Sequence, residues 1–199
     1  MLVKEFEDGL LGSNTFLGWD QVSKEGMVVD CGNPPEQIKR FAIENGIKVV
    51  WIVLTHGHCD HAKYADEYKT AFPEATLAAH AAENAVLTDP EANVTVYFGG
   101  AEAYKPAEES LNDGDTLRLG EGELTVISTP GHTPGSVCLY SSEDGIMFTG
   151  DTLFANGYGR TDFKYGSFQE LRESLKRLWR MGGTVCYPGH GEAFRISGS

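Results

Sequence analysis

The feature that most constrains this chain is a cluster of metal-binding side chains that directly follows a run of apolar residues. Residues 49–54, with the sequence VVWIVL, are aliphatic or aromatic and too few for a typical helix, so they predict a buried strand. Residues 55–61 then read THGHCDH, which places His56, His58, Asp60 and His61 directly after that strand. The fold must therefore end a buried strand in a loop that gathers four potential metal ligands.

This position at the end of a strand is where open α/β sheets commonly bind ligands. His56 and His58 are two residues apart and project to the same side of an extended backbone, whereas Asp60 and His61 lie where the chain turns into a helix. Three imidazoles and a carboxylate suit Zn²⁺, Fe or Mn²⁺, and the nitrogen-rich set favours zinc or iron. The sequence predicts a metal site here, with zinc as the first expectation.

Three later segments repeat the arrangement of a predicted strand that ends in a possible ligand beside a glycine. They are His132 after residues 124–127, Asp151 after residues 146–149, and His190 after residues 184–187. Glycine beside a ligand lets the backbone come close to a metal without steric conflict. Together with the first cluster, these segments account for five of the six histidines of the chain, so we expect all of them to form one centre.

Runs typical of strands are followed by helical patterns twice along the chain, which predicts two sheets sandwiched between helices in a single domain over residues 1–199. The expected strands are residues 2–6, 15–19, 26–30, 49–54, 76–79, 116–119, 124–127, 137–140, 146–149 and 184–187. The expected helices are residues 35–45 with Asn33 as N-cap, 62–71, 81–87, and one that opens with the capping box of residues 167–170. Residues 94–112 predict no clear element.

The composition excludes several classes of partner. A net charge of −13 and a pI of about 4.8 argue against nucleic acid or an anionic membrane as the main partner. No segment approaches the roughly 18 apolar residues of a membrane span. The N-terminal residues lack the features of a signal peptide, so we expect a cytoplasmic protein with a small-molecule substrate. The four cysteines, which form no CxxC pair, are Cys31, Cys59, Cys138 and Cys186.

The HxHxDH motif of residues 56–61, followed by a single histidine, an aspartate and a last histidine, resembles the metallo-β-lactamase superfamily. The resemblance covers nearly the whole chain and implies an α/β fold, the αββα sandwich, with the metal site at one edge. It also implies two divalent ions, zinc first and Fe or Mn as alternatives. By resemblance, one ion is held by His56, His58 and His132, the second by Asp60, His61 and His190, and both by Asp151 as a bridge.

The residues around and after Asp151 resemble particular groups within this superfamily. Residues 150–154 (GDTLF) and 157–163 (GYGRTDF) resemble glyoxalase II-like hydrolases and persulfide dioxygenases, whereas true β-lactamases match less well because a bridging aspartate is not part of their usual site. The implied activity is hydrolysis of a thioester such as hydroxyacylglutathione by a bridging hydroxide, with Asp60 as ligand and orienting group. The C-terminal helical domain that helps glyoxalase II hold glutathione is not expected, since nine residues follow His190.

Other activities stay open for the same ligand set. A persulfide dioxygenase binds a single iron through two histidines and a carboxylate, and the matching positions are His56, His132 and Asp151. A lactonase of the same fold is a further alternative within the hydrolases. A non-catalytic metal-binding domain is disfavoured, because none of the expected ligands is missing.

Further residues near the motifs have two interpretations each. Arg160 can form bidentate bonds to a substrate carboxylate, or it can form a structural pair with Asp162 or Asp151. Tyr158 is a second candidate for substrate contact. His80 follows a predicted strand but has no glycine neighbours, so we predict that it is not a ligand.

Overall fold

Two six-stranded sheets pack face to face between layers of helices in the computed structural model, which describes residues 1–7 and 9–197. The first sheet holds, from edge to edge, β1 (Leu2–Phe6), β2 (Thr15–Trp19), β3 (Glu25–Val29), β4 (Lys48–Val53), β5 (Thr76–His80) and β6 (Glu109–Leu111). The second holds β14 (Phe194–Arg195), β13 (Val185–Pro188), β10 (Ile146–Gly150), β9 (Val137–Ser141), β8 (Gly122–Ser128) and β7 (Thr116–Leu119). This is the αββα sandwich that the sequence predicted.

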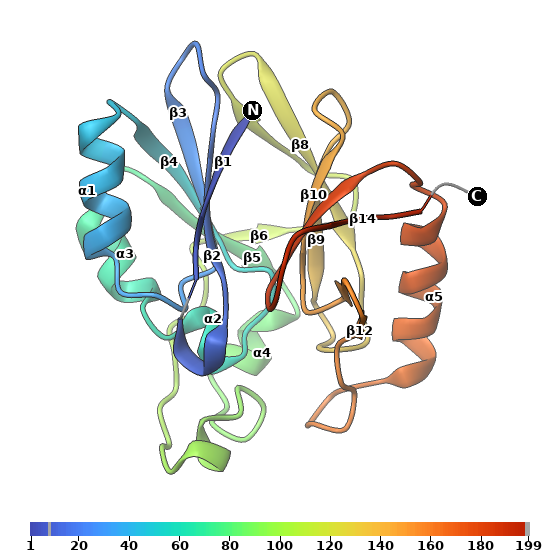
Figure 1. Cartoon of the computed structure of the whole chain (residues 1–199). Coiled ribbons are helices and arrows are strands. Elements are labelled where there is room, and N and C mark those ends of the chain that lie inside the picture. Colours follow the sequence, from blue (N-terminus) through green and yellow to red (C-terminus); the bar gives the residue numbers. More distant parts are fainter. Residues whose placement is uncertain (8, 198–199) are drawn as a thin grey trace.

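Helices cover the outer face of each sheet, as Figure 1 shows, with α1 and α3 on the side of the first sheet and α5 on the side of the second. The helices are α1 (Glu36–Glu44), α2 (Cys59–Ala62), α3 (Ala65–Ala71), α4 (Glu83–Leu87) and α5 (Phe168–Trp179), with the 3₁₀ helices η1 (Leu10–Gly12) and η2 (Thr95–Phe98). A small hairpin is formed by β11 (Leu153–Phe154) and β12 (Gly157–Tyr158). Among the described residues, no helix is long and apolar enough to cross a bilayer.

The alternation of side chains along the strands builds the core. Leu17 and Ile52 face the layer of α1 and α3, whereas their neighbours Phe16 and Val53 face the second sheet and pack with residues such as Phe148. Successive side chains of a strand point to opposite faces, so a strand buried on both faces reads as a continuous apolar run. Residues 49–54 were such a run, and β4 lies in the middle of its sheet.

The connections between parallel strands bring the strand ends to one edge. Strands β3, β4 and β5 are parallel to one another, and so are β10 and β13 of the second sheet. Parallel neighbours need crossover connections, which α1, α3 and α5 supply. The apolar stripe of α5 (Leu171, Leu175 and Leu178) packs against the second sheet and forms part of the core. Ser167 caps α5 by accepting a hydrogen bond from the Glu170 amide at 3.4 Å.

Two local predictions were wrong at helix boundaries. Asn33 does not cap α1, because Pro35 precedes its first residue and the Asn33 side chain instead donates to the Glu7 carbonyl at 2.9 Å. The helix predicted over residues 62–71 is divided into α2 and α3. The Tyr64 amide donates to the Cys31 carbonyl at 3.1 Å in place of a helical partner, which ends α2 after one turn.

Candidate metal centre

The seven predicted ligands come from the same edge of both sheets. The first sheet supplies the loop after β4 and the short helix α2, and the second supplies the segments that follow β8, β10 and β13. The structure brings them together in three overlapping groups, within each of which one potential ligand atom per residue lies within 4.8 Å of the others. The groups are His56, His58 and His132; His56, His61 and Asp151; and Asp60, His61 and His190.

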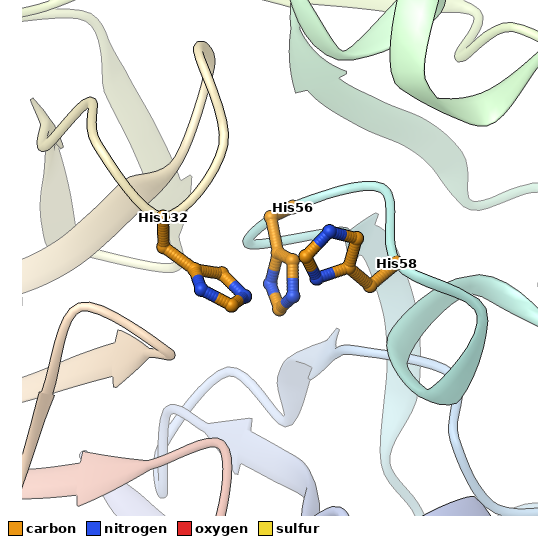
Figure 2. A group of neighbouring side chains, drawn as sticks. All are labelled: His56, His58 and His132. Carbon is orange, nitrogen blue, oxygen red and sulfur yellow. The ribbon is translucent and has the colours of Figure 1, made fainter. Parts of the chain in front are cut away.

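The first group is an open triangle of imidazoles. Figure 2 shows His132 facing His56 and His58 across the space between the two loops that carry them. The centroid of the His132 ring lies 4.8 Å from that of the His56 ring and 4.6 Å from that of the His58 ring, and the His132 ring is nearly perpendicular to both. All three side chains are buried. Nitrogens from three rings therefore converge on one buried point.

Hydrogen bonds to backbone carbonyls hold a proton on Nδ1 of two imidazoles. His132 Nδ1 lies 2.7 Å from the Arg160 carbonyl oxygen, and His190 Nδ1 lies 3.1 Å from that of Gly12. A carbonyl oxygen only accepts, so both Nδ1 atoms carry hydrogen. His132 Nε2 therefore keeps a lone pair that faces the cluster, as metal ligation requires. His190 Nε2 lies 3.1 Å from Asp60 Oδ2 and donates a hydrogen bond to it, so a cation that binds there must displace this proton.

A buried carboxylate that the sequence did not predict holds the proton on Nδ1 of two more imidazoles, directly for His61 and through Thr55 for His56. Asp30, directly after β3, lies 2.8 Å from His61 Nδ1 and accepts hydrogen bonds from the Thr55 amide at 2.7 Å and the Thr55 hydroxyl at 2.8 Å. The Thr55 hydroxyl in turn lies 3.1 Å from His56 Nδ1. Asp30 has a left-handed backbone with φ of 62°, uncommon for a residue other than glycine. Its position at a strand end was the one available sequence signal.

The buried atoms that face the centre lack hydrogen-bond partners. His56 Nε2, His58 Nε2, His132 Nε2 and Asp151 Oδ1 are all buried and unpaired within the described residues. Buried polar atoms in native proteins are almost always satisfied, so four unpaired atoms at one point call for a ligand. Three nitrogens and a carboxylate oxygen are the donor set that zinc and iron prefer, and the residues present therefore fit a divalent ion.

The two halves of the centre differ in their electrostatics. Burial, and to a lesser extent the neighbouring imidazoles, hold the pKa values of His56 and His58 well below the usual range. Both rings are therefore neutral, and each has a nitrogen lone pair that can bind a cation. For His61, burial lowers the pKa, but the carboxylates of Asp60 and Asp151 outweigh it and raise the pKa above its ordinary value. A cation that binds near His61 must displace a proton, so binding there weakens as the pH falls.

Glu83, on α4, joins the two loops that carry the imidazole triangle. Its carboxylate is fully buried and accepts hydrogen bonds from the Gly57 amide at 2.6 Å and the Gly135 amide at 2.7 Å. Burial raises the pKa of Glu83 to about 7. A glutamate in a short helix is expected on the surface, so its sequence position held no signal for this role. Glu83 fixes the loop after β4 relative to the loop after β8.

Close approach at Gly189 explains the glycine beside the last ligand. A Cβ atom at Gly189 would lie 2.3 Å from Asp151 Oδ1 and 2.7 Å from His61 Cε1, closer than real Cβ contacts allow. Asn14 holds this segment in place, because its amide donates to the Gly189 carbonyl at 2.7 Å and its side chain to the Pro188 carbonyl at 3.0 Å. The prediction that glycine permits close passage of the backbone therefore applies at this position.

Arg160 lies at the edge of the centre and makes the pair with Asp162 that the sequence left open. Its Nε and Nη2 atoms donate to the two carboxylate oxygens of Asp162 at 2.7 and 2.6 Å, and its guanidinium lies 4.1 Å from the ring centroid of Phe163. The Arg160 side chain also lines the cavity above the metal ligands.

Neither Tyr158, a candidate for substrate contact, nor His80, predicted not to be a ligand, is among the described residues of the cavity lining or of the three ligand groups. Tyr158 packs its ring 6.1 Å from that of Phe168 and is not among the described residues that line the cavity. His80 stands outside the three ligand groups, and its Nδ1 accepts a hydrogen bond from the Ala82 amide at 3.2 Å.

Comparison with characterised proteins gives relatives with two kinds of chemistry. The hydroxyacylglutathione hydrolase GloC of Haemophilus influenzae is 29% identical, with 89% of this chain and 85% of the relative covered. The human mitochondrial persulfide dioxygenase ETHE1 is 27% identical, with 96% of this chain and 68% of the relative covered. The first is named a hydrolase and the second a dioxygenase.

Solved structures share the whole fold. The B3 metallo-β-lactamase BLEG-1 superposes with a TM-score of 0.90 at 28% identity and covers 98% of this chain and 94% of its own. TTHA1623 in a di-iron-bound form has a TM-score of 0.82 at 28% identity, with 96% and 94% covered. The family model described as the metallo-beta-lactamase superfamily matches residues 8–190. With the αββα sandwich and its ligand cluster, this match shows that the chain belongs to the metallo-β-lactamase superfamily.

Proposed function

We propose that this protein is a binuclear metal-dependent hydrolase of thioesters, with hydroxyacylglutathione as the reference substrate. The observation that carries the proposal is the set of four buried donor atoms without hydrogen-bond partners. Two of their residues, His56 and Asp151, also form a group with His61, which in turn belongs to the group of Asp60 and His190. The likeness to GloC supports the thioester as the bond attacked. The four cysteines are unpaired and buried, which supports a cytoplasmic location as part of the same proposal.

Two ions would use the ligands in the two sets that the sequence resemblance implies. His56, His58 and His132 would hold one, and Asp60, His61 and His190 the other, with Asp151 between them because its oxygens lie 3.4 Å from His61 Nε2 and 3.6 Å from His132 Nε2. Divalent ions bound there supply a water with a lowered pKa and positive charge beside the attacked carbonyl oxygen. Zinc is the first expectation, with iron or manganese as alternatives.

Asp60 is the residue of the chain that we assign to orienting the attacking water. Its carboxylate lines the cavity and lies 3.1 Å from His190 Nε2. Burial acts to raise its pKa, but His61 and the hydrogen bond from His190 hold the pKa below its ordinary value. Asp60 is therefore ionised at neutral pH and can accept a hydrogen bond from the water that attacks the substrate carbonyl.

A second candidate is a persulfide dioxygenase with one iron. This candidate is supported by the meeting of two histidines and a carboxylate. His132 Nε2 lies 3.6 Å from Asp151 Oδ2, and the centroids of the His56 and His132 rings lie 4.8 Å apart. The likeness to human persulfide dioxygenase supports the same reading. This set is contained within the larger ligand set, so metal content separates the two candidates.

The first experiment is elemental mass spectrometry of protein purified without added metal or chelator, followed by assays matched to the result. About two ions per chain and hydrolysis of S-lactoylglutathione support the proposal, whereas one iron with oxygen uptake on glutathione persulfide replaces it. A lactone and a β-lactam in the same assay panel test the remaining hydrolases. Variants His58→Ala and Asp151→Ala should abolish hydrolysis while remaining folded. His80→Ala removes an imidazole outside the ligand groups and serves as the control.

A further inference from the structure

A cavity of about 400 Å³ opens directly above the ligand cluster. One part of its wall is metal-ligating side chains, among them His58, Asp60 and His190. The other part is apolar and comes from segments far apart in the sequence, and its Phe163 and Phe154 rings lie 5.7 Å and 6.2 Å from the rings of His58 and His190. Its members are Leu11, Val94, Phe98, Phe154 and Phe163, here called the apolar wall. A group bound at the ligand cluster must therefore lie against this wall.

Two members of the apolar wall are exposed, whereas Val94 is buried and Phe154 and Phe163 are half-buried. Phe98 is 57% exposed and Leu11 is 49% exposed, although both are large apolar side chains. Single exposed apolar residues are ordinary, but a group of them around a catalytic cavity is typical of a binding site. Val94 and Phe98 of the wall belong to residues 94–112, for which the sequence predicted no clear element.

The segment that carries Val94 and Phe98 is held rigidly. Val94 has a left-handed backbone with φ of 66°, which is strained for a β-branched residue. Asn93 is fully buried, and its side-chain oxygen accepts a hydrogen bond from the Thr95 amide at 3.0 Å. The Asn93 carbonyl accepts from the Cys59 amide at 2.9 Å, which ties the segment to the helix that carries Asp60 and His61. The wall is thus fixed relative to the metal ligands.

The positive charge on the cavity wall is already paired. Among the described residues that line the cavity, Arg160 is the single lysine or arginine, and its Nε and Nη2 atoms donate to the two carboxylate oxygens of Asp162. The nearby Lys164 is paired with Asp89 at 2.7 Å and with Glu91 at 3.0 Å. A glutathione thioester carries carboxylates that need free cations, whereas this wall offers apolar surface.

We propose that the apolar wall binds an uncharged, apolar group of the substrate, so that the preferred thioesters are neutral ones with an aliphatic or aromatic acyl or thiol part. This inference rests on the proposed thioester hydrolysis and specifies its substrate class. The fixed position of the wall above the ligands places such a group beside the scissile carbonyl. Hydroxyacylglutathione would then be cleaved with a lower kcat/KM than an apolar, neutral thioester.

The test compares two substrate series on the metal-loaded enzyme. One is N-acetylcysteamine thioesters of acetyl, butyryl and hexanoyl groups, and the other is acetyl thioesters of thiols of increasing length. In at least one series, kcat/KM should rise about fourfold per added methylene until the wall is covered, which corresponds to ~0.8 kcal/mol. The two series distinguish which side of the thioester the wall receives.

Matched variants test the wall itself. Phe98→Ser should reduce the rise per methylene, whereas Phe168→Ser, which removes an equally exposed phenylalanine outside the cavity, should keep it. Asp162→Asn releases the guanidinium of Arg160 and should raise kcat/KM for S-lactoylglutathione relative to the neutral thioesters. The gain should be up to about fivefold at low salt, which is ~1 kcal/mol for an exposed charge pair.

The outcomes separate this inference from the proposed function. A flat dependence on chain length in both series, or S-lactoylglutathione preferred over every neutral thioester, overturns the inference and leaves thioester hydrolysis standing. No hydrolysis of any thioester by the metal-loaded enzyme overturns both. A rise with chain length that Phe98→Ser leaves unchanged also overturns the assignment to this wall.

Discussion

Asp30 offers the sharpest test of how this centre is assembled. Its carboxylate is not itself a predicted ligand, but it holds a proton on Nδ1 of the ligand His61. Replacement by asparagine keeps the shape and removes one acceptor oxygen. If the Asn oxygen accepts from the Thr55 amide, its NH₂ group faces His61 Nδ1 and forces the ring proton onto Nε2, the atom that faces the centre. If the amide is reversed, its NH₂ group faces the Thr55 amide and two buried donors oppose each other.

In the first arrangement, a cation bound at Nε2 leaves the buried Nδ1 facing a donor in place of its acceptor, at a cost of ~1–3 kcal/mol to metal binding, whereas the reversed amide keeps that acceptor and costs folding stability instead. Since ~1.4 kcal/mol corresponds to a tenfold change in a dissociation constant, Asp30→Asn should weaken the ion held by the His61 group by about 5- to 150-fold. Partners of metal-ligating histidines have effects of ~10–100-fold in other proteins, which agrees with this range. Both Asp30 and His61 are buried, so solvent does not replace the lost bond.

The assay is competition for zinc between metal-free protein and a chromogenic chelator, which resolves two successive dissociation constants. Thr55→Val is the matched control, because it removes the hydroxyl beside His56 Nδ1 and leaves the contact between Asp30 and His61. Asp30→Asn should therefore weaken the His61 ion more than Thr55→Val does, and circular dichroism should show both variants folded. Two ions bound by Asp30→Asn with wild-type affinity would refute the reasoning.

Three further predictions concern residues around the centre and in the core. In metal-free protein, the pKa of Glu83 lies above its ordinary value, so the native state loses stability as the pH rises from 4.5 toward about 7. Glu83→Gln lacks this loss, and the stability advantage of wild type over Glu83→Gln in urea unfolding should shrink by up to ~3 kcal/mol between pH 5 and pH 8; a constant difference would contradict it. Gly189→Ala should lower zinc affinity at least tenfold by its contact with Asp151, while Gly122→Ala, with no atom closer than 3.5 Å, should not. Leu178→Ala should lower the free energy of unfolding by ~2–5 kcal/mol, since Leu178 is fully buried under α5, and a smaller loss would show that the core repacks.

Local patterns in the sequence were sufficient for most of the elements, because strand and helix periodicity depend on neighbouring residues. The two strands predicted over residues 137–140 and 146–149 are β9 and β10, and the turn at Gly145, with φ of 64°, joins them as an antiparallel hairpin. The divided helix after His61 was missed because its cause is remote. The Cys31 carbonyl that takes the Tyr64 amide belongs to another part of the chain.

The sequence by itself determined the layered fold and the candidate ligands, since each ligand directly follows a strand and the ends of parallel strands meet at one edge. Only the tertiary structure decided which residues support them. Glu83 bonds to amides 26 and 52 residues away, Asp30 contacts a histidine 31 residues away, and Asn93 braces a wall that no pattern predicted. Periodicity reports which side of an element is buried, whereas a hydrogen bond between distant residues depends on how the elements pack.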